Sequence, residues 1–135
     1  MNDAEMTRLF QDAKTIAVVG LSNNPGRASF GVARFLQAQG FRVVPVNPSY
    51  SEVLGEQCYA RIEDIRGEVD IVDVFRKAEA LPEVVADALT KHPKCVWMQE
   101  GVVNHEAAKA AEAAGIAVVM DRCILKELAR LLPRF

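Results

Sequence analysis

The stretch AVVGLSNNPGRASFGVARFL, residues 17–36, contains the transition that decides the fold. It opens with apolar residues typical of a buried strand, continues through a loop with two glycines and a proline, and then shows the apolar spacing of a helix. A strand, a glycine-containing loop and a helix in this order form the first unit of an α/β fold. The loop and the helix start also offer backbone N–H groups to an anion, so this stretch is the first candidate binding site.

The same alternation of strand and helix continues along the chain. Short runs rich in valine and isoleucine predict strands over 15–19, 42–46, 70–75, 94–98 and 116–120. Helical periodicity predicts helices over 3–13, 30–39, 78–90, 105–114 and 124–132. Because nearly every residue of the strands is apolar, both faces of the sheet must be covered, as in parallel sheets. We predict an α/β fold, Rossmann-like and doubly wound, with a parallel five-stranded sheet in a single domain over residues 1–135.

Residues at the helix ends support these boundaries. Gly40 and Gly115 directly follow two of the predicted helices, where a left-handed residue commonly ends a helix. Pro82 falls in the first turn of the helix that precedes the fourth strand, a position that tolerates proline. The exception is the polar segment 48–67, which crosses from the second strand to the third with only a short helical candidate at 62–65.

Length and charge narrow the possible functions. The 135 residues are half apolar, enough for one sizeable core and too few for a second. The 16 Lys and Arg residues and 18 Asp and Glu residues form no run of like charge, which argues against nucleic acid or an anionic membrane surface as partner. No apolar run approaches the ~18 residues that span a bilayer, and no signal-peptide pattern is present, so we expect a cytoplasmic protein. Three distant cysteines without a CxxC pair predict neither a disulfide framework nor a metal site.

The loop after the first strand has the composition of a phosphate site. Gly20 permits a tight turn and a close approach of the backbone, and Arg27 adds a charge-assisted donor. Short polar side chains lie at Ser22, Asn23 and Ser29. The alternative is an ordinary strand-to-helix turn with Ser29 as the helix N-cap. The spacing matches neither the GxGxxG fingerprint nor the P-loop, which disfavours an ordinary NAD or ATP site.

The ends of the second and third strands supply further candidates. Asn47 and Pro48 follow the second strand, where NAD-binding folds usually carry an acidic residue for the ribose. A neutral Asn47 suits a ligand with an additional phosphate near the ribose, or it simply starts a turn. Phe75 and Arg76, followed by Lys77, offer an aromatic surface and cations for an adenine with a phosphate nearby. The alternative is a core side chain beside solvated charges.

Six short motifs occur in order along the chain: VVGLS, NNPGRASFGV, VVPVNP, DVFR, WMQEGV and MDRC. In this series the chain resembles the stand-alone CoA-binding proteins related to the N-terminal CoA-binding domain of succinyl-CoA synthetase α subunits, over nearly its whole length. The resemblance implies that strand-end residues contact CoA. These are Gly20, Ser22, Asn23, Arg27 and Ser29 around the phosphates, Asn47 and Pro48 beside the adenosine, Phe75 and Arg76 near the adenine and phosphates, and Gln99, Glu100 and Gly101 along the pantetheine arm.

Cys123 follows the last strand at the predicted start of the final helix, where the helix dipole favours a thiolate. The resemblance matches it to the asparagine–cysteine corner of the synthetase domain, with Arg122 in place of the asparagine. A thiol at this position that faced bound CoA could form a mixed disulfide with it. The alternative is a buried cysteine that acts as a small hydrophobe.

No nucleophile with its base is recognisable by spacing, so we predict no catalytic residue. What the resemblance implies is binding of CoA or an acyl-CoA without ligase chemistry, in a carrier, sensor or regulatory role with an unidentified protein partner. Two alternatives remain. One is a small enzyme, either NAD(P)-dependent or a thiol-based CoA-transforming enzyme that uses Cys123. The other is an interaction module with an empty site, since fold alone does not fix function.

Overall fold

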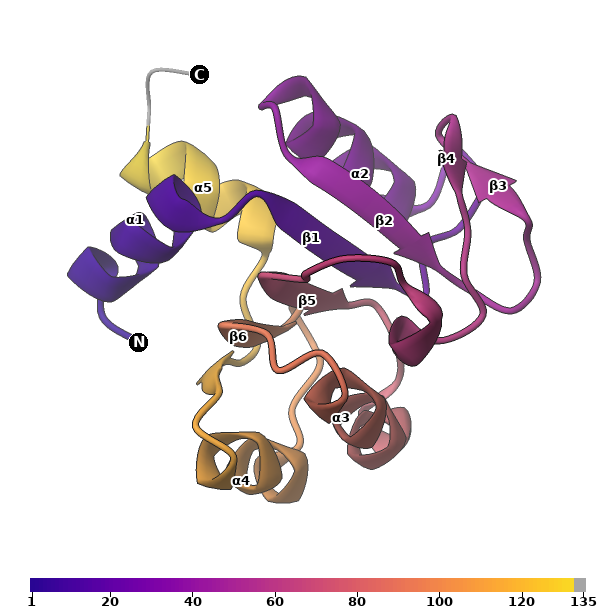
Figure 1. Ribbon diagram of the computed structural model, residues 1–135. Helices are drawn as coiled ribbons and strands as arrows, with labels where there is room; N and C mark the ends of the chain where they lie inside the picture. Colours follow the sequence, from indigo (N-terminus) through magenta and orange to yellow (C-terminus); the bar gives the residue numbers. More distant parts are fainter. Residues whose placement is uncertain (133–135) are drawn as a thin grey trace.

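The computed structural model describes residues 1–132, and a parallel sheet of five strands runs through its centre (Figure 1). The strand order is β2-β1-β5-β6-β7, and every neighbouring pair is parallel. The strands are β1 (Thr15–Val19), β2 (Arg42–Val46), β5 (Ile71–Val74), β6 (Cys95–Met98) and β7 (Ala117–Val119). The predicted α/β fold and its five-stranded sheet are confirmed, although the last three strands are slightly shorter than the sequence indicated.

Helices cover both faces of the sheet, as a doubly wound Rossmann-like fold requires. Figure 1 shows α1, α2 and α5 on one side and α3 and α4 on the other. Their bounds are α1 (Asp3–Asp12), α2 (Ala28–Ala38), α3 (Leu81–Leu89), α4 (His105–Ala113) and α5 (Ile124–Leu131). The predicted helix over 78–90 is a short 3-10 turn, η2 (Ala78–Ala80), followed by α3. Among residues 1–132, no helix combines the length and apolar character needed to cross a membrane.

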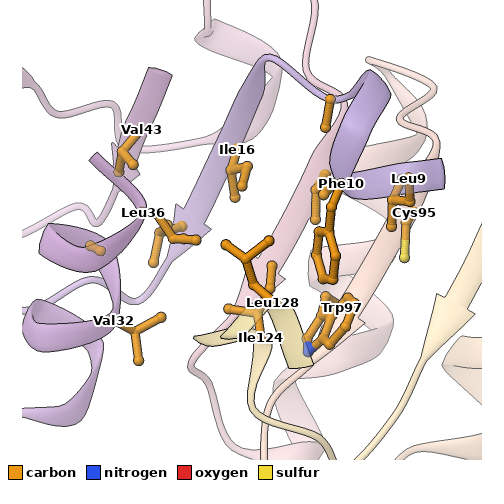
Figure 2. Close-up of a cluster of buried hydrophobic side chains, with 14 of the residues drawn as sticks. Leu9, Phe10, Ile16, Val32, Leu36, Val43, Cys95, Trp97, Ile124 and Leu128 are labelled. Carbon is orange, nitrogen blue, oxygen red and sulfur yellow. The ribbon is translucent and has the colours of Figure 1, made fainter. Parts of the chain in front are cut away.

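Each face of the sheet has its own apolar layer. Figure 2 shows the layer beneath α1, α2 and α5, where Ile124 and Leu128 of α5 pack beside Trp97 of β6. The rings of Phe10 and Trp97 lie 5.6 Å apart between centroids. The indole N–H of Trp97 donates to the carbonyl oxygen of Arg122, at 2.8 Å. Trp97 is therefore a core residue that also fixes the chain just before α5.

Glycines end two helices as the sequence predicted. Gly40, after α2, has a φ of 97°, and Gly115, after α4, has a φ of 82°. Both values lie in the left-handed region that favours glycine. Pro82 occupies the first turn of α3, where it removes no helical hydrogen bond.

The crossover between β2 and β5 contains a hairpin that the sequence did not reveal. Its strands are β3 (Glu52–Val53) and β4 (Glu56–Gln57), joined through Leu54 and Gly55, which both have positive φ. The short helical candidate at 62–65 is confirmed as the 3-10 turn η1 (Ile62–Asp64). The hairpin escaped prediction because strands of two residues are too short to show an alternating pattern.

The order in which strands are added to the sheet reverses at β1, although all strands stay parallel. After β1 the chain adds β2 on one side, and after the crossover it adds β5 on the other side of β1. In open α/β sheets, ligands bind beyond the carboxyl ends of the strands at such a switch point. The loops that follow β1 and β5 are therefore where a ligand is expected.

Candidate functional site

Two adjacent cavities lie at this switch point. The first cavity, of about 360 Å³, is lined by residues of the crossover and of α3, among them Asn47, Pro48, Arg61, Glu83 and Asp87. The second cavity, of about 410 Å³, is lined by the β1–α2 loop and the loops after β5 and β6, among them Ser22, Arg27, Ser29, Phe75, Gln99 and Cys123. Gly20 and Arg76 line both cavities and so mark their junction.

The junction is built on a close approach between two backbones. Gly20 has a φ of 83°, and a Cβ atom there would lie 2.3 Å from the carbonyl oxygen of Phe75. The same Cβ would lie 3.1 Å from the Cδ atom of Arg76. Glycine at position 20 therefore lets the ends of β1 and β5 meet and lets the Arg76 side chain lie across them.

The β1–α2 loop is held by its own short side chains. Ser22 N donates to Ser29 Oγ at 3.0 Å, and Asn24 N donates to Ser22 Oγ at 3.0 Å. Gly26 N donates to Asn24 Oδ1 at 2.9 Å. The suggestion that Ser29 is the N-cap of α2 is wrong, because Arg27 occupies that position and Ser29 lies buried inside the first turn. Ser29 instead closes the loop back onto Ser22.

Three cations lie at the second cavity, one from this loop and two from the segment after β5. The side chains of Arg27, Arg76 and Lys77 line the second cavity, and within residues 1–132 they form no ion pair or hydrogen bond. Ala28 and Ser29, the first residues of α2, line the same cavity. The first turn of a helix presents N–H groups without intrahelical partners and a partial positive charge. The cations and the helix start together make the second cavity suited to an anionic group.

Asn47 links the ends of β1 and β2. Its Nδ2 donates to the Leu21 carbonyl oxygen at 3.1 Å, and its Oδ1 accepts from Ser49 N at 2.9 Å. The turn predicted at Asn47 is therefore present, and the side chain also fixes one wall of the first cavity. No acidic residue directly follows β2, but Glu83 and Asp87 of α3 bring two carboxylates to that cavity.

The loops after β6 and β7 are fastened to each other. Ile124 N, at the start of α5, donates to Gln99 Oε1 at 3.1 Å, and Gly101 N donates to Asp121 Oδ1 at 2.7 Å. Gln99 is almost fully buried. Its side chain thus completes the first turn of α5, while its position still lines the second cavity.

Cys123 is the N-cap residue of α5, and it is half-buried at the wall of the second cavity. It lies at that wall together with Gln99 and Glu100. Two residues expected at the ligand, Asn23 and Gly101, line neither cavity.

Sequence reasoning missed the contribution of the crossover and of α3. Arg61 of the crossover lines the first cavity, as do Glu83 and Asp87, which lie one helical turn apart. A polar residue in an exposed helix or an irregular segment reads as a solvated side chain, so the signal was weak. The spacing of Glu83 and Asp87 on one face of a helix was the only available indication.

The sheet also buries one carboxyl group that the sequence reading passed over. Asp73 of β5 is fully buried, and within residues 1–132 neither of its carboxyl oxygens has a hydrogen-bond partner. Its neighbours in register are Val18 of β1 and Trp97 of β6. Burial raises the pKa of Asp73 well above its ordinary value, because an ionised carboxylate is costly in an apolar surrounding.

Sequence similarity to known proteins extends over most of the chain. The sequence profile of the CoA binding domain matches residues 14–129. The uncharacterized protein YneT of Bacillus subtilis is 41% identical over 121 residues, which cover 90% of each chain. The alpha subunit of ADP-forming acetate–CoA ligase II from Pyrococcus furiosus is 39% identical over 130 residues, which cover 88% of this chain and 28% of that subunit.

A solved structure extends the match to three dimensions. A hypothetical protein from Pyrococcus horikoshii superposes with a TM-score of 0.95 at 39% identity, covering 98% of this chain and 93% of that one. The resemblance to a succinyl-CoA synthetase-like CoA-binding domain is thus confirmed by the profile and by the ligase relative. With its profile match, its sequence relatives and its fold in agreement, the chain belongs to the CoA binding domain family.

Proposed function

We propose that this protein binds CoA or an acyl-CoA and has no catalytic apparatus of its own, so that it acts as a carrier, a sensor or a regulatory subunit. The observation that carries the proposal is the pair of cavities joined at Gly20 and Arg76 on the switch point of the sheet. CoA is an elongated molecule with an adenosine at one end, a diphosphate in the middle and a pantetheine arm at the other. Two neighbouring cavities that share Gly20 and Arg76 in their walls fit that arrangement.

The residues present suit each part of such a ligand. Valine side chains from β1, β2 and α3 line the first cavity and offer apolar walls to an adenine ring. Arg27, Arg76 and Lys77 offer charge-assisted donors to the diphosphate. Beyond them the second cavity continues toward Gln99 and Cys123, which would border the pantetheine arm.

The chemistry of the β1–α2 loop argues against NAD as the preferred ligand. The loop lacks the glycine spacing that brings an NAD diphosphate against the helix start, and Asn47 stands where an acidic residue usually holds the ribose. We therefore expect the stripped protein to prefer CoA over NAD.

A thiol-based enzyme acting on CoA esters is the second candidate, and it rests on the position of Cys123 at the wall of the second cavity. The test is a search for turnover of acyl-CoA substrates by the wild-type protein and by Cys123→Ser. Turnover that disappears in Cys123→Ser supports an enzyme. Turnover that is unchanged removes Cys123 from the chemistry.

The test of the proposed function begins with protein purified without added ligand. The protein is denatured, and any small molecule that it releases is identified by mass spectrometry. The stripped protein is then titrated with CoA, acetyl-CoA and NAD by calorimetry. Retention or binding of CoA or its ester without NAD supports the proposal. Binding of NAD without CoA overturns it, and binding of none of the three favours an interaction module with an empty site.

A further inference from the structure

The first cavity contains a cation that the binding of a diphosphate does not use. Arg76 lies at the junction and lines both cavities, whereas Arg61 lines the first cavity alone. Arg61 belongs to the crossover, directly before η1, and reaches the cavity beside Asn47 and Pro48. The ribose end of a ligand in this cavity would therefore meet a guanidinium group of its own.

The backbone that carries Arg61 is anchored to α3. Asp87 Oδ2 accepts from Ile62 N at 2.7 Å, and Asp87 Oδ1 accepts from Glu63 N at 3.0 Å. These two bonds satisfy the first N–H groups of η1 with a carboxylate of α3 that also lines the cavity. At the other end of the turn, the Lys91 ammonium donates to the Ile65 carbonyl oxygen. The wall around Arg61 is thus fixed at both ends, by Asp87 of α3 and by Lys91 just after that helix.

The guanidinium itself is oriented and still has free donors. Arg61 Nη1 lies 2.9 Å from Glu63 Oε1, and Arg61 Nη2 lies 3.9 Å from Asp87 Oδ1. The second distance is too long for a hydrogen bond, so one close ion pair uses only part of the five N–H donors of the group. The Arg61 side chain is 60% exposed. An arginine fixed in this way is suited to a phosphate, which it contacts through two parallel hydrogen bonds.

We propose that Arg61 recognises the phosphate on the ribose of CoA, and that this contact distinguishes CoA from dephospho-CoA, the same molecule without that phosphate. The inference rests on the proposed function. The neutral Asn47 adds no negative charge at the end of β2, so Arg61 and Arg76 balance the carboxylates of Glu83 and Asp87 that line the same cavity. Asp87 is a positioning residue in this account, since it holds the backbone from which Arg61 extends.

The test compares the two ligands on four proteins by calorimetry. These are the wild type, Arg61→Gln, Arg61→Lys and the control Arg66→Gln, which removes one arginine charge further along the same crossover and outside both cavities. We expect the wild type and Arg66→Gln to bind CoA about tenfold or more tightly than dephospho-CoA, as charge-assisted hydrogen bonds allow. Arg61→Gln should bring the ratio close to one, and Arg61→Lys should give an intermediate ratio because it keeps the charge and loses the planar fork.

The ratio separates recognition from folding, because a loss of structure weakens both ligands together. Tight binding of CoA with the same ratio in Arg61→Gln as in the wild type overturns the role of Arg61 and leaves the proposed function standing. A wild-type protein that binds CoA and dephospho-CoA with equal affinity would also overturn the role of Arg61 and leave the proposed function standing. If the wild type binds no CoA at all, the proposed function fails, and the role of Arg61 fails with it.

Discussion

The backbones of Gly20 and Phe75 meet at the end of the sheet so closely that a Cβ on residue 20 would lie 2.3 Å from the Phe75 carbonyl oxygen. This contact sets the spacing of β1 and β5 at the switch point and supports the Arg76 side chain between the two cavities. Both the stability of the fold and the shape of the site therefore depend on the lack of a side chain at Gly20.

Gly20→Ala should destabilise the protein by more than the ~1 to 2 kcal/mol that a left-handed conformation costs an alanine, because the new methyl group also collides with backbone. It should weaken CoA binding as well, because β5 and Arg76 must shift. The control is Gly115→Ala, which has a similar φ of 82° and open space around the added Cβ. Urea unfolding and calorimetry measure both effects, and equal destabilisation by the two variants would contradict the role of the Phe75 contact.

The cations of the second cavity should contribute to affinity separately from stability. Arg27→Gln and Arg76→Gln should each weaken CoA binding by about 1.5 to 3 kcal/mol, the range for a charge-assisted hydrogen bond. Arg34→Gln, on the exposed face of α2 and outside both cavities, removes the same charge and should leave affinity nearly unchanged. Calorimetry of the three variants provides the comparison. An equal loss in all three would indicate a general charge effect and not a site.

Much of the fold could be predicted because the sheet is buried on both faces. β1 and β2 begin and end at the predicted residues, since a run of apolar residues between polar ones has clear limits. The β3–β4 hairpin had no such signal, because its strands have two residues each and its turn places Leu54 at a positive φ that leucine rarely adopts. The burial of Asp73 was not predicted, because one polar residue does not interrupt the apolar run that predicts a strand.

Site residues that follow strand ends could be predicted from the sequence, whereas those of the crossover and of α3 could not. Gly20, Arg27 and Phe75 stand directly after or near strand ends, and parallel strands bring such residues together. Arg61 and Asp87 come together through the path of the crossover, which depends on tertiary contacts between η1 and α3. Local sequence patterns carry no information about that path.

The buried carboxyl of Asp73 should make stability depend on pH. Its pKa is raised in the folded protein, so the unfolded chain ionises near the model-peptide value of 3.8 while the folded protein keeps the proton. Stability from this group is present below that value and is lost as pH rises toward the folded pKa. Asp73→Val should therefore be more stable than the wild type by about 1 to 3 kcal/mol at neutral pH, with a smaller difference at pH 4.

Asp73→Asn serves as the control for titration, because it keeps a polar group of the same shape and cannot ionise. The free energy of unfolding of Asp73→Asn minus that of the wild type should increase as pH rises from 4 to 8, because only the wild type loses stability through this group. Urea unfolding at several pH values measures it. A difference that stays constant over this range would show that Asp73 does not change its ionisation on folding.

The three cysteines should differ in reactivity. Cys95 is fully buried, and burial raises the pKa of its thiol to about 12, while burial also raises the pKa of the Cys58 thiol. Only a thiolate reacts with alkylating agents. Half-buried Cys123 should therefore be labelled first by iodoacetamide under native conditions, and bound CoA should slow that labelling. Mass spectrometry of digested samples identifies the labelled residue, with Cys123→Ser as control, and early labelling of Cys58 or Cys95 would contradict the structure.

Asp87 should stabilise the protein through the two N–H groups that it accepts. In Asp87→Ala, the N–H groups of Ile62 and Glu63 lose their acceptor beside a buried isoleucine, and we expect a loss of about 1 to 3 kcal/mol in the free energy of unfolding. Glu83→Ala, one turn earlier on the same helix, removes a carboxylate that forms no hydrogen bond or ion pair within residues 1–132, so it should cost only a few tenths of a kcal/mol. Urea unfolding of both variants decides the matter: a large loss in Asp87→Ala alone means that η1 depends on α3, whereas equally small losses in both variants would mean that the hydrogen bonds from Asp87 to η1 contribute little to stability.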